Sequence, residues 1–264
     1  MAEGVSSTGI AALDAFLRGG LPKGFSTLML APAGAGAEIF AKQFAVGARG
    51  EKVVYVTTDE SAQEVRQAAQ EAKWDVSSVE ILDLQSEFAE EMMATQEKGT
   101  APPKETRPRF DPRDLVEGTR STDVLRRRRP VLEEAGTGYL GRLISVFTRL
   151  RPPERLVVHS LDFFLNLYPI EQVVATLTAL KAANVRHGGL MLWVLAKGAH
   201  SVAEERRLEL LADCLLELEV NRKGTSFERF FMVKKVKNRA YGIGISTYEI
   251  GPDGFRLETL ERIV

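Results

Sequence analysis

A buried strand, a loop of small residues and a helix follow one another in residues 25–44, and this segment constrains the fold most strongly. Its sequence is FSTLMLAPAGAGAEIFAKQF, in which apolar residues dominate 26–31. After the loop, Ile39, Phe40 and Phe44 recur at the spacing of one helix face. This order is typical of a P-loop, where backbone N–H groups at a helix N-terminus surround a phosphate.

The loop lacks the side chains through which a P-loop holds its ligand. Ala31, Gly36, Ala37 and Glu38 stand at the defining positions of G-x-x-x-x-G-K-[ST], so the first glycine, the lysine and the hydroxyl are absent. The lysine neutralises the outer phosphates, and the hydroxyl is a magnesium ligand. A carboxylate such as that of Glu38 in the first turn stabilises a helix by about 0.3–1 kcal/mol. Its negative charge also repels a triphosphate. We therefore expect a degenerate P-loop made of Gly34, Ala35, Gly36, Ala37 and Glu38.

Composition bounds the class of protein. The chain has 264 residues, of which 44% are apolar and 27% charged, and its net charge is −1. It can form a large core, and no overall field favours a nucleic acid or a membrane surface. Cys214 is the single cysteine, and its apolar neighbours indicate a buried thiol in a reducing compartment. Because neither a bilayer-spanning run nor a signal peptide is evident, we expect a cytoplasmic protein without membrane insertion.

Strands and helices alternate along most of the chain. Asp59 and Glu60 follow one predicted strand directly, and Ser61 with Glu64 forms a capping box for the next helix. Near-continuous apolar runs predict buried parallel strands at 53–57, 79–82, 155–160, 190–195 and 214–220. Helices are predicted between them, at 10–17, 38–47, 61–73, 140–150, 170–183 and 203–211. The last part predicts only strands, at 229–237, 243–250 and 255–258, with a hairpin turn at Asp253–Gly254.

This order predicts an α/β fold. A mostly parallel sheet is covered by helices on both faces and ends in a C-terminal antiparallel meander. Residues 86–135 interrupt the pattern and predict a flexible insertion, rich in proline and arginine, within one domain that spans 1–264. A helix is expected at 88–93. The run Arg126–Arg129 could contact nucleic acid or an acidic protein partner. The alternative is a solvated loop, and we favour it because no aromatic residues are interleaved with the arginines.

The chain resembles the KaiC-like branch of the RecA superfamily of ATPases, except at about 86–135. The segment Thr8-Gly9-Ile10 and the later Gly19-Gly20-Leu21-Pro22-x-Gly24 resemble the family's lead-in to its P-loop. Residues 56–61, VTTDES, resemble the strand that ends in the acidic pair. The resemblance implies a RecA-like fold and assigns Asp59 and Glu60 the activation of the attacking water.

Two further strands carry the resemblance. Residues 155–161, RLVVHSL, resemble the strand whose last acidic residue steadies magnesium, and here His159 takes that position. Residues 233–237, VKKVK, resemble the late strand whose basic residues reach a neighbouring subunit's phosphates. The resemblance thus implies trans contacts by Lys235 and Lys237. It also implies a homo-oligomer, commonly a hexameric ring with nucleotide between subunits.

The chain departs from the family pattern at the positions that bind phosphate and magnesium in the family. Because the hydroxyl and the aspartate of the family face one magnesium ion, we expect Glu38 and His159 to be neighbours joined by a charge-assisted hydrogen bond. A transition-metal site that adds Asp59 or Glu60 is an alternative. Since a lone histidine at a strand end is more often structural, the sequence predicts no metal. Asp162 is expected to lie outside the site.

The leading hypothesis is a non-catalytic KaiC-like ATPase homologue, a regulatory or scaffold subunit that acts through protein–protein contacts and needs no cofactor. It forms a homo-oligomer or a mixed ring with an active paralogue. One alternative is an active KaiC-like ATPase in signal transduction that binds ATP and magnesium with a basic residue from Lys42, Lys235 or the insertion. The other is a RecA-like, DNA-binding recombination mediator, although nucleic acid is not an expected partner.

Overall fold

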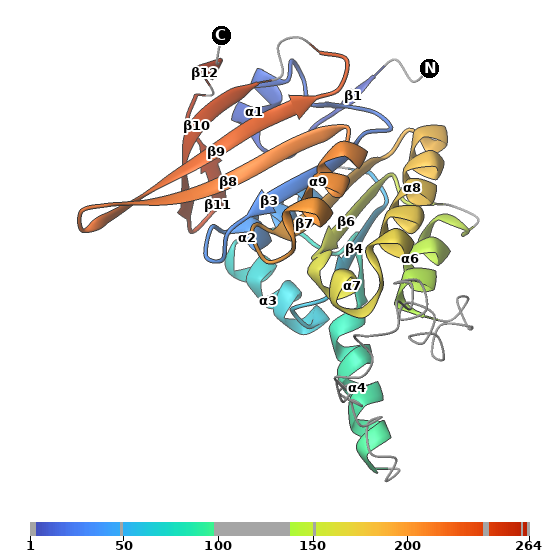
Figure 1. The fold of residues 1–264 in the computed structure, drawn as a ribbon. Helices are drawn as coiled ribbons and strands as arrows, with labels where there is room; N and C mark the ends of the chain where they lie inside the picture. Colours follow the sequence, from blue (N-terminus) through green and yellow to red (C-terminus); the bar gives the residue numbers. More distant parts are fainter. Residues whose placement is uncertain are drawn as a thin grey trace, which may run out of the picture.

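A mixed β-sheet forms the centre of the computed structural model, which describes residues 4–47, 50–97, 138–149, 152–239, 243–259 and 261–262 (Figure 1). Within these residues the sheet has ten strands in the order β11-β10-β9-β8-β3-β7-β6-β4-β5, with β12 beside β10. The strands are β3 (Ser26–Ala31), β4 (Val53–Thr57), β5 (Val79–Asp83), β6 (Arg155–His159), β7 (Leu190–Ala196), β8 (Cys214–Lys223), β9 (Ser226–Val236), β10 (Gly244–Gly251), β11 (Gly254–Leu257) and β12 (Glu261–Arg262).

The predicted α/β fold is confirmed. Strands β5, β4, β6, β7, β3 and β8 pair in parallel, and β8, β9, β10 and β11 pair antiparallel, which is the C-terminal meander. A short ribbon of β1 (Val5–Ser6) and β2 (Leu21–Pro22) precedes β3. Every residue of β3, β4 and β6 is buried, as expected for strands covered on both faces.

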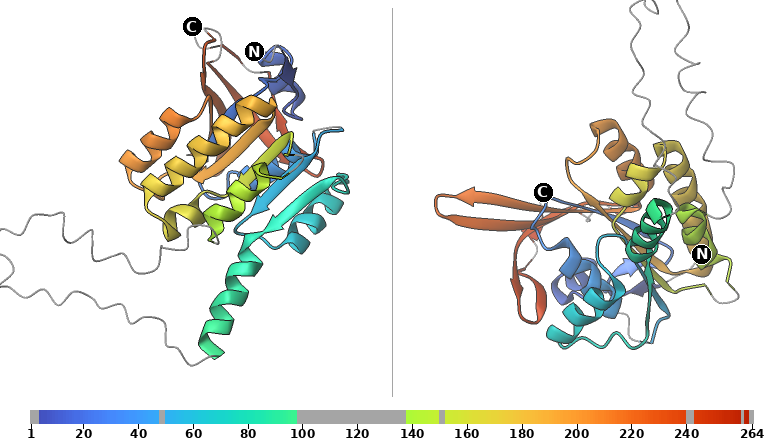
Figure 2. Two further views of the ribbon diagram at one scale, coloured as in Figure 1. Left: turned by 90° about the vertical axis from the view of Figure 1, so that its right-hand side faces the viewer. Right: turned by 90° about the horizontal axis from the view of Figure 1, so that it is seen from below.

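Helices cover both faces of the sheet, as Figure 2 shows. One core contains side chains of α1 (Ala11–Phe16), α2 (Ala37–Val46) and α3 (Ala62–Glu71). The other contains side chains of α6 (Tyr139–Phe147), α7 (Asp162–Leu167), α8 (Ile170–His187) and α9 (Val202–Leu211). Successive residues of the parallel strands alternate between the two cores: Met29 faces the first, and Leu28 and Leu30 face the second. None of the described helices is long and apolar enough to cross a membrane.

The structure differs from the sequence predictions at helix ends. The helix expected at 88–93 is α4 (Leu84–Glu97), which projects from the body of the domain (Figure 1). The helix predicted at 170–183 continues as α8 to His187. Most of the predicted insertion lies outside the described residues, and the run Arg126–Arg129 lies there with it.

Arg155 joins the start of β6 to the N-terminal segment. Its side chain is fully buried, with Nε 2.9 Å from Oε2 of Glu51. Its terminal nitrogens donate to the carbonyl oxygens of Phe44, at 2.6 Å, and Ser7, at 2.7 Å. The guanidinium also lies 4.5 Å from the centre of the Phe44 ring. This one side chain therefore holds together β6, the end of α2 and the segment that leads to α1.

We predict that Arg155→Met lowers the free energy of unfolding by about 3 kcal/mol, because it leaves Glu51 and two carbonyl groups without their partner. Urea unfolding monitored by circular dichroism measures the loss. Arg207→Met is the matched control, since Arg207 pairs with Glu171 at the surface, where an ion pair contributes at most about 1 kcal/mol. Equal losses in the two variants would contradict the role given to Arg155.

Candidate functional site

The loop between β3 and α2 has the backbone shape of a P-loop. Gly34 and Gly36 adopt left-handed conformations, with φ of 76° and 83°, and Gly36 is the N-cap of α2. A Cβ atom on Gly36 would lie 2.2 Å from Cδ1 of Ile250, so β10 packs directly on the loop. The hydroxyl of Tyr248 donates to the carbonyl oxygen of Ala35 at 2.6 Å. Contacts with the C-terminal meander therefore hold the loop in shape.

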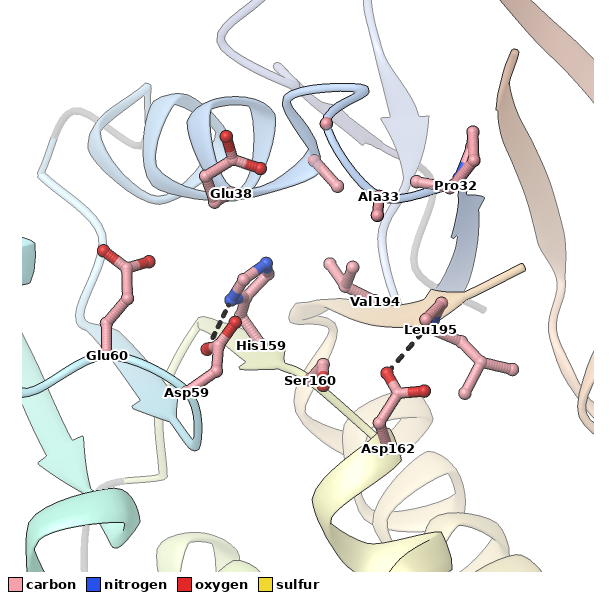
Figure 3. Close-up of a pocket in the computed structure, with 14 residues that line it drawn as sticks. Pro32, Ala33, Glu38, Asp59, Glu60, His159, Ser160, Asp162, Val194 and Leu195 are labelled. Atoms are coloured by element: carbon pink, nitrogen blue, oxygen red, sulfur yellow. Dashed lines mark hydrogen bonds and ion pairs between the residues drawn. The ribbon is translucent and has the colours of Figure 1, made fainter. Parts of the chain in front are cut away.

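A cavity of about 420 Å³ lies where the parallel strands end (Figure 3). Strands β3, β4, β6 and β7 bring their carboxyl ends to one edge of the sheet, where ligands bind in open α/β folds. The cavity is lined by Ala31, Pro32, Ala33, Gly34, Ala37, Glu38, Asp59, Glu60, His159, Ser160, Asp162, Val194, Leu195 and Ala196. The structure thus brings together the degenerate loop, the acidic pair and His159.

His159 pairs with Asp59, and the predicted contact with Glu38 is wrong. Nδ1 of the buried His159 lies 2.9 Å from Oδ1 of Asp59. No hydrogen bond joins Glu38 to His159 among the described residues, although both line the cavity (Figure 3). The register explains the choice of partner, because Thr57 of β4 pairs with His159 of β6 and Asp59 follows two residues later. Glu38 instead approaches from α2, across the cavity.

Glu60, the second carboxylate of the pair, is bound by Lys42. The ammonium group of Lys42 lies 2.7 and 2.6 Å from the two carboxylate oxygens of Glu60. Only 5% of the Lys42 side chain is exposed, so water screens this ion pair weakly. Lys42 lies one helical turn beyond Glu38 and therefore supplies its charge to the acidic pair and not to the loop.

The hydroxyl of Tyr55 is influenced by the negative charges at this edge of the sheet. It is buried and has no hydrogen-bond partner in the described structure. Burial raises the pKa of Tyr55 well above its ordinary value, and the charges of Glu60, Asp59 and Glu38 raise the pKa further. Three carboxylates therefore act together on one buried group, as expected if they surround a single negative cavity.

Asp162 lies in the site, where the sequence analysis did not place it. Its side chain lines the cavity, and Oδ2 accepts a hydrogen bond from the backbone N–H of Ala196 at 3.0 Å. Oδ1 lies 2.8 Å from Nε2 of His200. A signal was present, because Asp162 lies only three residues after His159, the end of β6, and begins α7.

The lysines predicted to reach a neighbouring subunit have partners within their own chain. Lys235 donates to the carbonyl oxygens of Glu209, at 3.0 Å, and Ala212, at 2.7 Å, at the end of α9. Burial, and then the nearby charge of Lys181, lowers the pKa of Lys235. Lys237 lies 3.6 Å from Oδ1 of Asp213 and is half exposed. Lys235 therefore stabilises a helix C-terminus.

Lys197 is the basic residue near the loop that the sequence analysis missed. Its backbone N–H donates to the carbonyl oxygen of Ala31 at 2.9 Å, which places it beside the start of the loop. Its ammonium group binds the buried carboxylate of Glu217 and lies 3.1 Å from Oε1 of Glu219. Glu217 also binds Lys234 at 2.6 Å. The charge of Lys197 is thus neutralised within the sheet.

The group of described residues best arranged to hold a metal ion is Asp59, Glu60 and His159. One ligand atom from each lies within 4.8 Å of the other two. In the sequence, Glu38 stands at the position of the motif's magnesium hydroxyl, and the family resemblance places His159 at that of the magnesium aspartate.

Comparison with known proteins agrees with this architecture. A family model described as ATPase: KaiC matches residues 6–121, which include the degenerate loop and the acidic pair. None of the curated proteins matches the sequence. Many solved structures share the fold, among them a KaiC-like protein from the hyperthermophilic archaeon Pyrococcus horikoshii OT3.

That likeness has a TM-score of 0.63 and covers 97% of this chain and 99% of the archaeal chain. At 20% identity it shows the shared fold alone. The family match adds the sequence relationship over the part of the chain that carries the P-loop frame. Residues 6–121 therefore match the KaiC ATPase family model, and the chain as a whole shares its fold with a KaiC-like protein.

Proposed function

We propose that this chain is a non-catalytic KaiC-like ATPase homologue that acts as a regulatory or scaffold subunit through protein–protein contacts. The observation that carries the proposal is the state of the acidic pair. Asp59 is paired with His159, and Glu60 is bound by Lys42, so each carboxylate has a basic partner from its own chain. The positions of the phosphate-binding lysine and the magnesium hydroxyl are Ala37 and Glu38.

Phosphoryl transfer depends on positioning and on neutralising the phosphate charge. Neither Ala37 nor Glu38 supplies a positive charge, and the cavity is lined in addition by Asp59, Glu60 and Asp162. The carboxylate of Glu60 is occupied on both oxygens by Lys42, so it is less available to orient a water molecule. These features disfavour both the binding and the hydrolysis of a triphosphate.

The alternative is an active KaiC-like ATPase in signal transduction that binds ATP and magnesium with a substitute cation. Lys42 would have to leave Glu60, and Lys235 would have to leave the carbonyl groups that end α9. Lys197, the basic residue beside the loop, would have to leave Glu217. Each exchange gives up a partly buried interaction, so a nucleotide-free site is the better supported proposal. The DNA-binding alternative rests on fold likeness alone.

A scaffold role needs surfaces for partners, and exposed apolar side chains support it. Leu210 on α9 is 80% exposed and Val202 on the same helix is 75% exposed. Phe227, in β9 near the tip of the β8–β9 hairpin, is 64% exposed. We propose a homo-oligomer, with a hexameric ring as the family form, or a mixed ring with an active paralogue. We also propose a cytoplasmic location, which fits the buried thiol of Cys214, whose pKa burial raises to about 12.

We predict that the natural chain gives no saturable heat when it is titrated with ATP and magnesium in a calorimeter. The double variant Ala37→Lys, Glu38→Thr restores the lysine and the hydroxyl, and we expect it to bind at least about tenfold more tightly. A triple variant that adds His159→Asp restores the magnesium aspartate and is expected to bind more tightly still. Light scattering on the natural chain should show a mass that ATP does not change.

A matched control separates repair of the site from the change in net charge. Gln67→Lys, Glu71→Thr on the exposed side of α3 makes the same two charge changes outside the cavity. It should not confer ATP binding. Micromolar binding of ATP by the natural chain would contradict the proposed loss of the phosphate site and would favour the active alternative.

We predict that Lys42 and Glu60 are coupled by about 1–3 kcal/mol, because removing one partner leaves a partly buried charge. Urea unfolding of Lys42→Met, Glu60→Gln and the double variant measures this coupling. The pair Lys223–Glu228 is the control, since both side chains are exposed and their coupling should not exceed about 1 kcal/mol. Additive losses at Lys42 and Glu60 would show that the pair is not a stabilising unit.

A further inference from the structure

We propose that Asp59, Glu60 and His159 bind a divalent transition-metal ion, and that zinc is the ion this ligand set fits best. The three side chains come from the ends of two adjacent parallel strands, β4 and β6. One ligand atom from each lies within 4.8 Å of the other two. The inference does not rest on the proposed function, because such an ion needs no nucleotide to hold it.

The histidine distinguishes this cluster from an ordinary group of surface carboxylates. His159 is 5% exposed, and one of its ring nitrogens is held by Asp59. The other ring nitrogen has no hydrogen-bond partner in the described structure and points into the cavity (Figure 3). This nitrogen is open to the cavity and can bind a ligand there.

The chemistry of the ligands selects the class of ion. Magnesium prefers oxygen ligands alone, whereas an imidazole together with carboxylates suits zinc and neighbouring transition metals. The exchange of aspartate for His159, at the position that the family resemblance gives to magnesium, therefore moves the preference away from magnesium. Nδ1 of His159 and Oδ1 of Asp59 lie 2.9 Å apart, close enough to bind the same ion.

The geometry requires only a small closing movement. Zinc binds nitrogen and oxygen ligands at about 2.0–2.2 Å, so two ligand atoms on one ion are at most about 4.4 Å apart. The side chain of Asp59 is 48% exposed, so a small rotation can move its carboxylate by the few tenths of an ångström needed. Glu60 keeps lone pairs for a metal while Lys42 binds its carboxylate, and ligating carboxylates commonly have such a partner.

The surroundings favour a cation. Glu38 and Asp162 line the same cavity and add negative charge around the cluster. The cavity of about 420 Å³ leaves space for water molecules as the remaining ligands. Zinc sites with three protein ligands and a water molecule in the fourth position are well known in proteins.

The test is calorimetric titration of the untagged full chain with zinc chloride, after treatment with a chelator and without nucleotide. We expect one zinc ion per chain. His159→Asn and Asp59→Asn should each weaken binding at least about tenfold, because each removes one of the three ligands. His187→Asn is the matched control, since His187 ends α8 and does not line the cavity. It should bind zinc as the natural chain does.

Thermal unfolding provides the second readout. Zinc should raise the Tm of the natural chain and of His187→Asn, but not that of His159→Asn, since a ligand stabilises only the fold that binds it. Unfolding without metal shows whether each variant is folded, and Asp59→Asn serves if His159→Asn is not. Excess magnesium should not displace zinc. Absence of saturable zinc binding by the natural chain, or equal affinity in the folded His159→Asn variant, would overturn the proposal.

Discussion

The register of the parallel strands is the constraint on which the rest of the structure depends. Ala31 pairs with Ala196, and Thr57 pairs with His159, so the loop, the acidic pair and His159 all emerge at one edge of the sheet. A shift of one residue in any of these strands would exchange the side chains between the two cores. Because both faces of these strands are buried, the packing that stabilises the sheet also fixes the geometry of the cavity.

At that edge several carboxylates have basic partners within the chain itself. Lys42 binds Glu60, His159 pairs with Asp59, and Lys197 binds Glu217. Buried or half-buried carboxylates without partners would lower the stability of the fold, because desolvation disfavours an unpaired charge. Internal pairing therefore explains how this edge can be stable with no ligand, although the cavity as a whole remains negative through Glu38 and Asp162.

The sequence predicts the fold well because its signals are local. Continuous apolar runs mark the buried strands, and the capping box of Ser61 and Glu64 marks the start of α3 as predicted. The partners of the site residues depend on contacts between distant segments, and local patterns do not contain them. Glu38 and Asp59 were both plausible neighbours of His159, and only the pairing of β4 with β6 decides between them. The hydrogen bond from Lys235 to the carbonyl oxygen of Ala212, at the end of α9, could not be predicted for the same reason.

The loop has the backbone form of a P-loop although Ala37 and Glu38 stand where the motif has its lysine and hydroxyl, and its contacts with the meander explain why. In a P-loop the ligand and the loop stabilise each other, so a loop that binds nothing is expected to relax unless other contacts hold it. Here Tyr248 binds the carbonyl oxygen of Ala35, and Ile250 occupies the space beside Gly36. Both residues belong to β10, which is anchored by pairing with β9 and β11. The shape of the cavity thus follows from the sheet itself, which leaves the residues around it free to serve a different ligand.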